Sequence, residues 1–140
     1  MEGQFQSYSR YKVLTAVYKK EDNVGVISSQ ISGRDWGRTL YWLLETNEKL
    51  RDDIIKDSTA WGNYDSISLT GSNEKYKMNN IYDFSGNVWE YTTENISGSG
   101  VSRGNGAVYV NKKMVSVRNS SLDNYLLAGA VSSRMVLYLK

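Results

Sequence analysis

Tyr82-Asp83-Phe84-Ser85-Gly86-Asn87-Val88-Trp89-Glu90-Tyr91 is the stretch that decides how this 140-residue chain folds. Gly86 followed by Asn87 readily takes the positive φ angles that a tight turn needs. Such a turn sends the following residues in a new direction, so Trp89 is expected to anchor the core, with the tyrosines at both ends of the stretch close by. The stretch therefore predicts a tight turn next to a buried tryptophan.

The same stretch carries two carboxylates, Asp83 and Glu90, which are seven residues apart on either side of the turn. At that spacing they could converge, and the carbonyl oxygens of Gly86 and Val88 could complete an oxygen cage for Ca²⁺. In the alternative, both carboxylates accept backbone N–H bonds and hold the turn. A third use, as the paired carboxylates of a glycan hydrolase, is disfavoured because both residues flank a structural turn. The residue types leave the first two alternatives open.

Upstream of this stretch, the chain from residue 32 onward predicts an α-helix. Ser32 followed by Asp35 resembles a capping box, with Asp in place of the usual Glu. Apolar residues follow at helical spacing: Trp36, Leu40, Leu43 and Leu44. This pattern indicates a helix whose apolar face packs on the core. Residues 47–56 are expected to form a second helix or a continuation of the first.

Strand patterns lie on both sides of the helix. Residues 11–17 alternate and are rich in β-branched and aromatic side chains, and residues 24–27 are a short candidate partner. Residues 135–139 are apolar on both faces, which is typical of a central strand. Two further strand-like pieces are residues 107–110 and residues 114–117. Between helix and turn, residues 57–80 are polar and small, and we expect this excursion to be pinned to the core by Trp61.

Composition narrows the chemistry of the chain. It has no His and no Cys, which excludes an imidazole base, a thiolate nucleophile, a disulfide and the usual zinc or iron sites. Carboxylate chemistry and cations held by oxygen remain open. The length and the apolar fraction of 40% predict a single domain over residues 1–140, either a whole protein or the C-terminal part of a larger one. No apolar run approaches the roughly 18 residues of a membrane span and no signal-peptide pattern opens the chain, so no membrane insertion is expected.

The net charge of +2 is unevenly distributed along the chain. Residues 1–94 hold 11 Lys and Arg against 14 Asp and Glu, a net −3, whereas residues 95–140 hold 6 against 1, a net +5. The basic residues of the C-terminal third are scattered, and a scattered set is a weak footprint for nucleic acid. Nucleic acid is therefore not expected as a partner.

Residues 82–91 resemble the motif Y/L-D-M-x-G-N-V-W-E-W of the formylglycine-generating-enzyme (sulfatase-modifying factor) family. Two further stretches agree in order and rough spacing. Arg103-Gly104-Asn105-Gly106 resembles a degraded R-G-G-S-W, and Ser132-Ser133-Arg134 stands where the family has G-F-R before an apolar strand. The resemblance extends over roughly residues 30–140. It implies an α+β, C-type-lectin-like fold with one or two helices and short, twisted antiparallel strands.

The chain departs from that family at the residues that carry its chemistry. Members that make formylglycine rely on cysteines and related iron-dependent members rely on histidines, and this chain has neither. The resemblance therefore transfers a scaffold without an enzymatic activity or catalytic residues. It also transfers a calcium expectation to Asp83 and Glu90, because this loop binds calcium in some members.

In short phage and bacterial members, including the variable proteins of diversity-generating retroelements, ligand-binding residues lie between the R-G-G-like and G-F-R-like segments. Here that interval runs from residue 105 to residue 131. Its candidate ligand-binding residues mix rigid aromatic groups with short polar ones, as antibody paratopes do. They are Asn105, Tyr109, Asn111, Arg118, Asn119, Ser120, Asp123, Asn124 and Tyr125. Taken singly, any of them is more readily explained as a loop former.

The sequence as a whole predicts a non-enzymatic module that binds a protein or glycan receptor on a cell surface. Such a module would belong to a virion or to a bacterial surface. The alternatives are a carboxylate-based glycan-processing enzyme and a purely structural domain of a larger phage or bacterial protein.

Overall fold

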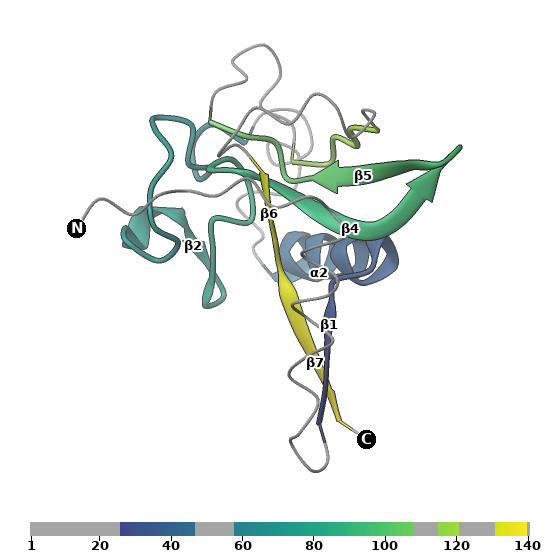
Figure 1. The fold of residues 1–140 in the computed structure, drawn as a ribbon. Helices are drawn as coiled ribbons and strands as arrows, with labels where there is room; N and C mark the ends of the chain where they lie inside the picture. The colour runs from purple at the N-terminus through teal and green to yellow at the C-terminus, as the bar shows by residue number, and fades with distance from the viewer. Residues whose placement is uncertain (1–25, 47–57, 108–114, 121–130, 140) are drawn as a thin grey trace, which may run out of the picture.

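The computed structural model describes residues 26–46, 58–107, 115–120 and 131–139. This part of the chain contains one α-helix and seven strands in three small sheets, which confirms the predicted α+β class (Figure 1). No helix within the described ranges is long and apolar enough to cross a membrane. The strand predicted for residues 11–17 and the helix predicted for residues 47–56 lie outside the described residues.

Helix α2 (Gly33–Thr46) begins where its cap predicts. The Ser32 hydroxyl accepts a hydrogen bond from the Asp35 backbone N–H at 3.0 Å and donates one to Asp35 Oδ2 at 2.6 Å. These bonds satisfy a backbone donor that the first turn of a helix leaves without an intrahelical partner. The predicted apolar stripe is buried: Trp36, Leu40, Leu43 and Leu44. The helix and its core face are confirmed.

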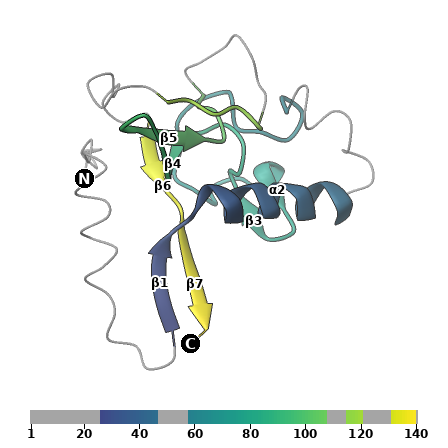
Figure 2. The same ribbon diagram turned by 90° about the vertical axis from the view of Figure 1, so that its right-hand side faces the viewer.

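Strands β1 (Val26–Gln30) and β7 (Met135–Leu139) form an antiparallel pair that extends away from helix α2 (Figure 2). Strand β1 contains the end of the strand predicted for residues 24–27 and continues three residues beyond it. Among the described residues, β7 pairs with β1 in a two-stranded sheet, which contradicts the prediction that residues 135–139 form a central strand. Leu137 is 72% exposed on β7. On the opposite face, Val136 packs against the core.

Two hairpins are each closed by a two-residue loop in which both residues have positive φ angles. Strands β2 (Lys77–Met78) and β3 (Ile81–Tyr82) are joined by Asn79 and Asn80, with φ angles of 45° and 64°. Strands β4 (Trp89–Ile96) and β5 (Ser99–Arg103) are joined by Ser97 and Gly98, with φ angles of 51° and 85°. Two-residue loops with positive φ at both positions match the right-handed twist of the strands they join.

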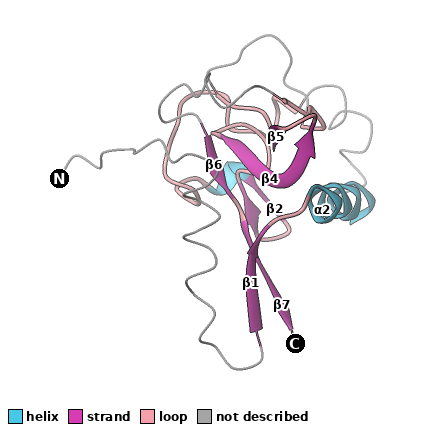
Figure 3. Ribbon diagram, turned by 45° about the vertical axis from the view of Figure 1, so that its right-hand side comes forward, coloured by secondary structure: helices cyan, strands magenta, loops and turns pink. Residues whose placement is uncertain are grey.

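The largest described sheet has the order β5-β4-β6, with β4 in the centre (Figure 3). Strand β6 (Val131–Ser133) runs parallel to β4 and pairs Val131 with Trp89. A parallel neighbour requires a long connection between the two strands. The chain between β5 and β6 supplies that connection, and it contains most of the interval from residue 105 to residue 131.

The Gly86-Asn87 turn forms as predicted, with φ angles of 78° and 59°. The turn packs against Asn63, whose carbonyl accepts the Asn87 N–H and whose N–H donates to the Ser85 carbonyl. A Cβ atom on Gly86 would lie 2.2 Å from the Asn63 carbonyl oxygen. This close approach of two backbones, together with the positive φ, explains why glycine is required here.

The core is centred on two stacked aromatic rings. Trp36 of α2 and Phe84 of the turn stretch stack with their ring centroids 4.4 Å apart, and both are at most 1% exposed. Trp61 joins the same cluster, which confirms that it pins the polar excursion. Trp89 is buried as predicted, at 6% exposed. Phe84 is the core contact that the sequence interpretation overlooked.

The strand predicted for residues 114–117 is wrong over the residues that are described. Val115 lies in a turn and is fully buried in the core cluster, and the backbone next pairs at Asn119, which bridges to Ser102 of β5. Burial of one valine fixes this segment without a ladder of backbone hydrogen bonds. Of the piece predicted for residues 107–110, only Ala107 is described, and it belongs to a turn.

Candidate binding surface

Glu90 is buried and bound by two donors from distant parts of the chain. Arg134 donates from Nε to Glu90 Oε2 at 3.1 Å and from Nη2 to Glu90 Oε1 at 2.5 Å. The Trp36 indole N–H adds a bond to Oε2 at 3.2 Å. Such a two-point contact between a guanidinium and a carboxylate is among the stronger charged interactions in proteins. We name this group of three residues the Glu90 clamp.

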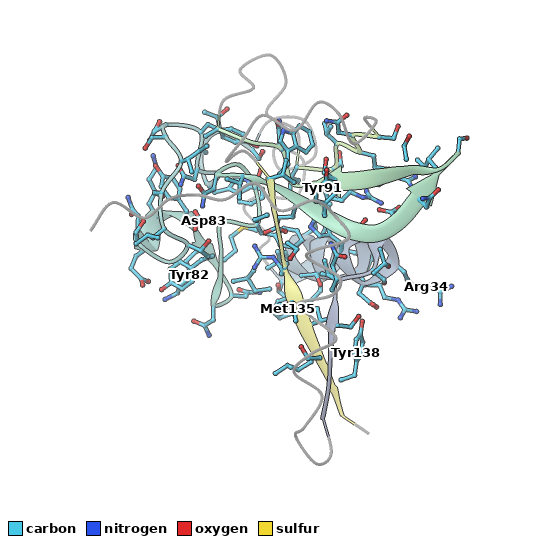
Figure 4. All side chains as sticks on the ribbon, viewed as in Figure 1. Arg34, Tyr82, Asp83, Tyr91, Met135 and Tyr138 are labelled. Atoms are coloured by element: carbon cyan, nitrogen blue, oxygen red, sulfur yellow. The ribbon has the colours of Figure 1, made fainter. Side chains whose placement is uncertain are left out.

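Arg134 also binds the backbone of the turn stretch. Its Nη2 donates to the carbonyl oxygens of Tyr82 and Asp83 at 3.1 and 3.4 Å, and its guanidinium lies 5.5 Å from the centre of the Phe84 ring. In Figure 4, Tyr82 and Asp83 lie on one side of the chain path from β6 to β7, and Arg34 of α2 lies on the other. Arg134, which lies between β6 and β7, therefore links residues 82–91 to the C-terminal end of the interval 105–131.

Asp83 has a different set of partners. Its Oδ2 accepts the Gly71 N–H at 3.2 Å, and the Asn63 amide approaches its Oδ1 at 3.5 Å. Asp83 itself has a positive φ of 49° and is 6% exposed. Its carboxylate thus stabilises the loop between residues 63 and 71, while the carboxylate of Glu90 stabilises the packing of α2 and Arg134.

This geometry bears on the calcium prediction for Asp83, Gly86, Val88 and Glu90. The guanidinium of Arg134 occupies the side of the Glu90 carboxylate that a cation would need, and two positive charges repel each other there. Within the described ranges, no three acidic side chains lie close enough together to hold a metal ion. The donor set does not fit a calcium ion in this arrangement. The alternative, in which both carboxylates accept backbone N–H bonds, holds for Asp83, whereas Glu90 is bound by side-chain donors.

A second charged cluster lies where β4 and β5 pass the start of α2. Arg103 donates to both oxygens of Glu94, from Nε at 2.8 Å and from Nη2 at 2.9 Å. Arg118 donates to Oε1 from Nη2, and the Thr92 hydroxyl donates to Oε2 at 3.0 Å. We name Glu94 with these two arginines the Glu94 cluster.

The position of Glu94 is set by a glycine on the neighbouring helix. A Cβ atom on Gly33, the first residue of α2, would lie 1.9 Å from Glu94 Cδ. Burial of the Glu94 carboxylate raises its pKa, but the bonds from Arg103, the charge of Arg103, the bond from Thr92 and the charge of Arg118 outweigh burial and lower the pKa below its ordinary value. Glu94 is therefore held in its charged form.

Four of the nine predicted ligand-binding residues lie in the described part of the chain, and they differ in exposure. Asn105 is 2% exposed with a φ of 64°, and its side chain accepts the Gly106 N–H, so it is buried as a turn former and not displayed. Arg118 and Ser120 are exposed, and Asn119 is half-buried. The other five lie outside the described residues: Tyr109, Asn111, Asp123, Asn124 and Tyr125.

Both ends of the interval attach next to the turn. At one end, the Ala107 N–H donates to the Asn87 carbonyl at 3.0 Å. At the other end, Val131 pairs with Trp89, which is two residues beyond Asn87. In the middle, Asn119 exchanges two backbone hydrogen bonds with Ser102, at 2.9 and 3.0 Å. The described ends of the interval therefore lie close together, and its described middle is attached to β5.

The sequence interpretation missed the roles of Arg134 and Glu94. Arg134 had been noted only as part of a family pattern, and its partner lies 44 residues earlier in the chain. Glu94 was not singled out from the sequence, because its partners Arg103 and Arg118 lie 9 and 24 residues later in the chain. Comparison with known proteins adds nothing here, since no family model, curated protein or solved structure matches the chain.

Proposed function

We propose that this chain is a non-enzymatic binding module that displays residues 105–131 on a C-type-lectin-like scaffold of the formylglycine-generating-enzyme type. Its target is a protein or glycan receptor on a cell surface, and its setting is a phage particle or a bacterial surface. The scaffold part of the proposal rests on the motif resemblance together with the α+β architecture. The binding part rests on the geometry of the interval.

One observation carries the proposal: the interval begins and ends beside the same turn. Ala107 is bonded to Asn87, and Val131 is paired with Trp89. Loops whose ends are fixed by a rigid frame are the usual carriers of binding residues, because the frame holds them while their sequence varies. The buried Glu90 clamp joins this frame to Arg134, which follows β6.

The carboxylates of the turn stretch support binding over hydrolysis. A glycan hydrolase needs two carboxyl groups that reach the same sugar linkage. Asp83 and Glu90 are each 6% exposed and bound to different protein donors. Both carboxylates therefore stabilise the fold itself, and we assign ligand recognition to residues 105–131.

The experiment is a binding screen with a triple variant. Wild-type protein is screened on an array of glycans and cell-surface proteins, and each hit is repeated with Tyr109, Arg118 and Tyr125 all replaced by Ala. Loss of binding with an unchanged melting temperature supports the proposal. Binding that survives all three replacements contradicts it, as does an array without any hit.

A matched control comes from helix α2. Arg38, Tyr41 and Trp42 provide one arginine and two aromatic residues that are exposed on the helix, and Tyr41 is 63% exposed. Their replacement by Ala removes the same kinds of side chain from another surface. We expect the control variant to bind every hit as the wild type does.

Calcium is tested separately by thermal unfolding in EDTA and in excess Ca²⁺. Because Arg134 already neutralises Glu90, we expect the melting temperature to be the same in both. A higher melting temperature in Ca²⁺ that disappears in the Glu90→Gln variant would instead place calcium in the turn stretch.

A further inference from the structure

The Glu94 cluster holds more positive than negative charge. One carboxylate faces two guanidinium groups, so the three side chains sum to one positive charge. Arg103 binds both carboxylate oxygens and its side chain is 12% exposed, whereas the Arg118 side chain is 50% exposed. Arg103 alone therefore suffices to neutralise Glu94, and the excess charge lies on Arg118 at the surface.

The hydrogen bond to Glu94 orients the Arg118 guanidinium and engages only one of its nitrogens. This hydrogen bond comes from Nη2 of Arg118. A guanidinium has five N–H donors on three nitrogens in one plane, so a group fixed at one corner can still present two parallel donors. Two parallel N–H donors match the two oxygens of a carboxylate or a sulfate group.

The surroundings of Arg118 favour an acidic sugar over a protein partner. Residues 95–140 carry a net charge of +5, and pairing of Arg103 with Glu94 and of Arg134 with Glu90 leaves a net +3, which attracts an anion over a long range. Ser116, Asn119 and Ser120 lie near Arg118 in the sequence and are polar, Val117 is half-buried, and none of the large exposed apolar side chains lies in residues 115–120. Protein interfaces usually need such apolar anchors, while hydroxyl and amide side chains suit the hydroxyl groups of a sugar.

We propose that Arg118 binds the acidic group of an anionic glycan, with Glu94 as the residue that positions it. This inference rests on the proposed function and adds the class of ligand. The acidic group is a sugar carboxylate or sulfate, since the two share the geometry that Arg118 matches. Glu94 does not contact the ligand, and Gly33 acts one step further away by leaving room for the Glu94 side chain.

The test measures dissociation constants for four probes. Heparin hexasaccharide carries sulfate and carboxylate groups, a hyaluronan oligosaccharide carries carboxylates only, a dextran oligosaccharide is neutral, and polyglutamate is an acidic peptide. Wild-type protein should bind heparin, hyaluronan or both, more weakly as salt is added. Binding to heparin alone identifies sulfate as the acidic group, and binding to hyaluronan identifies carboxylate. Dextran should not bind.

Variants assign the binding to Arg118. Arg118→Gln should weaken acidic-glycan binding about ten-fold or more, because it removes a charge-assisted pair of bonds, while Arg118→Lys should recover part of the loss. Arg38→Gln, the same change on an exposed arginine of α2, should have no effect. Gly33→Ala should also weaken binding while Arg118 itself is intact, and Gly37→Ala, where a Cβ meets nothing within 4 Å, should not. Far-ultraviolet circular dichroism of each variant confirms that it is folded.

Three results overturn the inference. The first is that neither acidic glycan binds. The second is that the Arg118→Gln variant binds them as the wild type does. The third is that binding is confined to polyglutamate. Different results would contradict the proposed function. If an array partner is bound through residues 105–131 and is insensitive to Arg118→Gln, the module is a binder of another ligand class. If no partner of any kind binds, both proposals fall.

Discussion

Replacement of Arg134 by Met should be among the most destabilising single changes in the described part of the chain. Met has a similar length and leaves little empty space, so the main loss is the charge and its hydrogen bonds. Glu90, which is 6% exposed, would then keep the hydrogen bond from the Trp36 indole N–H. Removing one partner of a buried ion pair costs about 3–5 kcal/mol, and because the Arg134 side chain is 22% exposed we expect about 3 kcal/mol.

Glu90→Gln should cost less, about 2 kcal/mol, since an amide oxygen can still accept from Trp36 while Arg134 keeps two backbone carbonyls. The double variant should cost about 3 kcal/mol, which leaves a coupling energy of about 2 kcal/mol between the two residues. Urea unfolding followed by tryptophan fluorescence measures all three values. Arg38→Met, on the exposed face of α2, is the matched control and should stay within about 0.5 kcal/mol of the wild type.

Two outcomes would refute the reasoning behind the Glu90 clamp. The first is an Arg134→Met variant that loses less than about 1 kcal/mol, which is the range of an exposed ion pair. The second is a pair of single changes whose effects add to within about 0.5 kcal/mol, which would mean that the two side chains do not interact.

The remaining predictions concern the Glu94 cluster and the core. Gly33→Ala should lose about 1–3 kcal/mol because its Cβ meets Glu94 Cδ at 1.9 Å, whereas Gly37→Ala should gain about 0.5–1 kcal/mol of helix stability; equal urea midpoints would contradict this. Phe84→Ala should cost about 3–5 kcal/mol and Leu69→Ala, at 75% exposed, about 0.5 kcal/mol or less in the same assay, and comparable losses would place the core elsewhere. Because the pKa of Glu94 is lowered from 4.5 on folding, its stabilising effect is present above that value and is lost as the pH falls through the lowered pKa. Glu94→Gln should flatten the acid side of the stability profile, and an unchanged slope would rule out this contribution.

Local signals predicted the parts of the fold that depend on neighbours in sequence. Four features follow from backbone preferences or from apolar spacing. They are the capping box at Ser32, the apolar stripe that begins at Trp36, the Gly86-Asn87 turn and the burial of Trp61. Each of these needs only a few adjacent residues and a core somewhere nearby. For that reason the sequence alone predicts them.

Contacts between distant residues could not be read in the same way. Arg134 and Glu90 are 44 residues apart, and Arg118 and Glu94 are 24 apart, so no periodicity links them. The same holds for β7, because an apolar run has the same composition whether it is central or lies in a two-stranded pair with Leu137 exposed. Asn105 was misplaced for another reason: asparagine serves both as a recognition residue and as a former of buried turns with positive φ.

Hydrogen–deuterium exchange on the complex with an array partner tests the central claim most directly, because it locates the bound surface on the intact chain. The account predicts slower exchange in peptides from residues 105–131 when the partner is bound, and unchanged exchange in α2 and in the β1–β7 pair. Slower exchange on α2 or on β1 and β7, with residues 105–131 unchanged, would show that the chain binds through another face and would contradict the account.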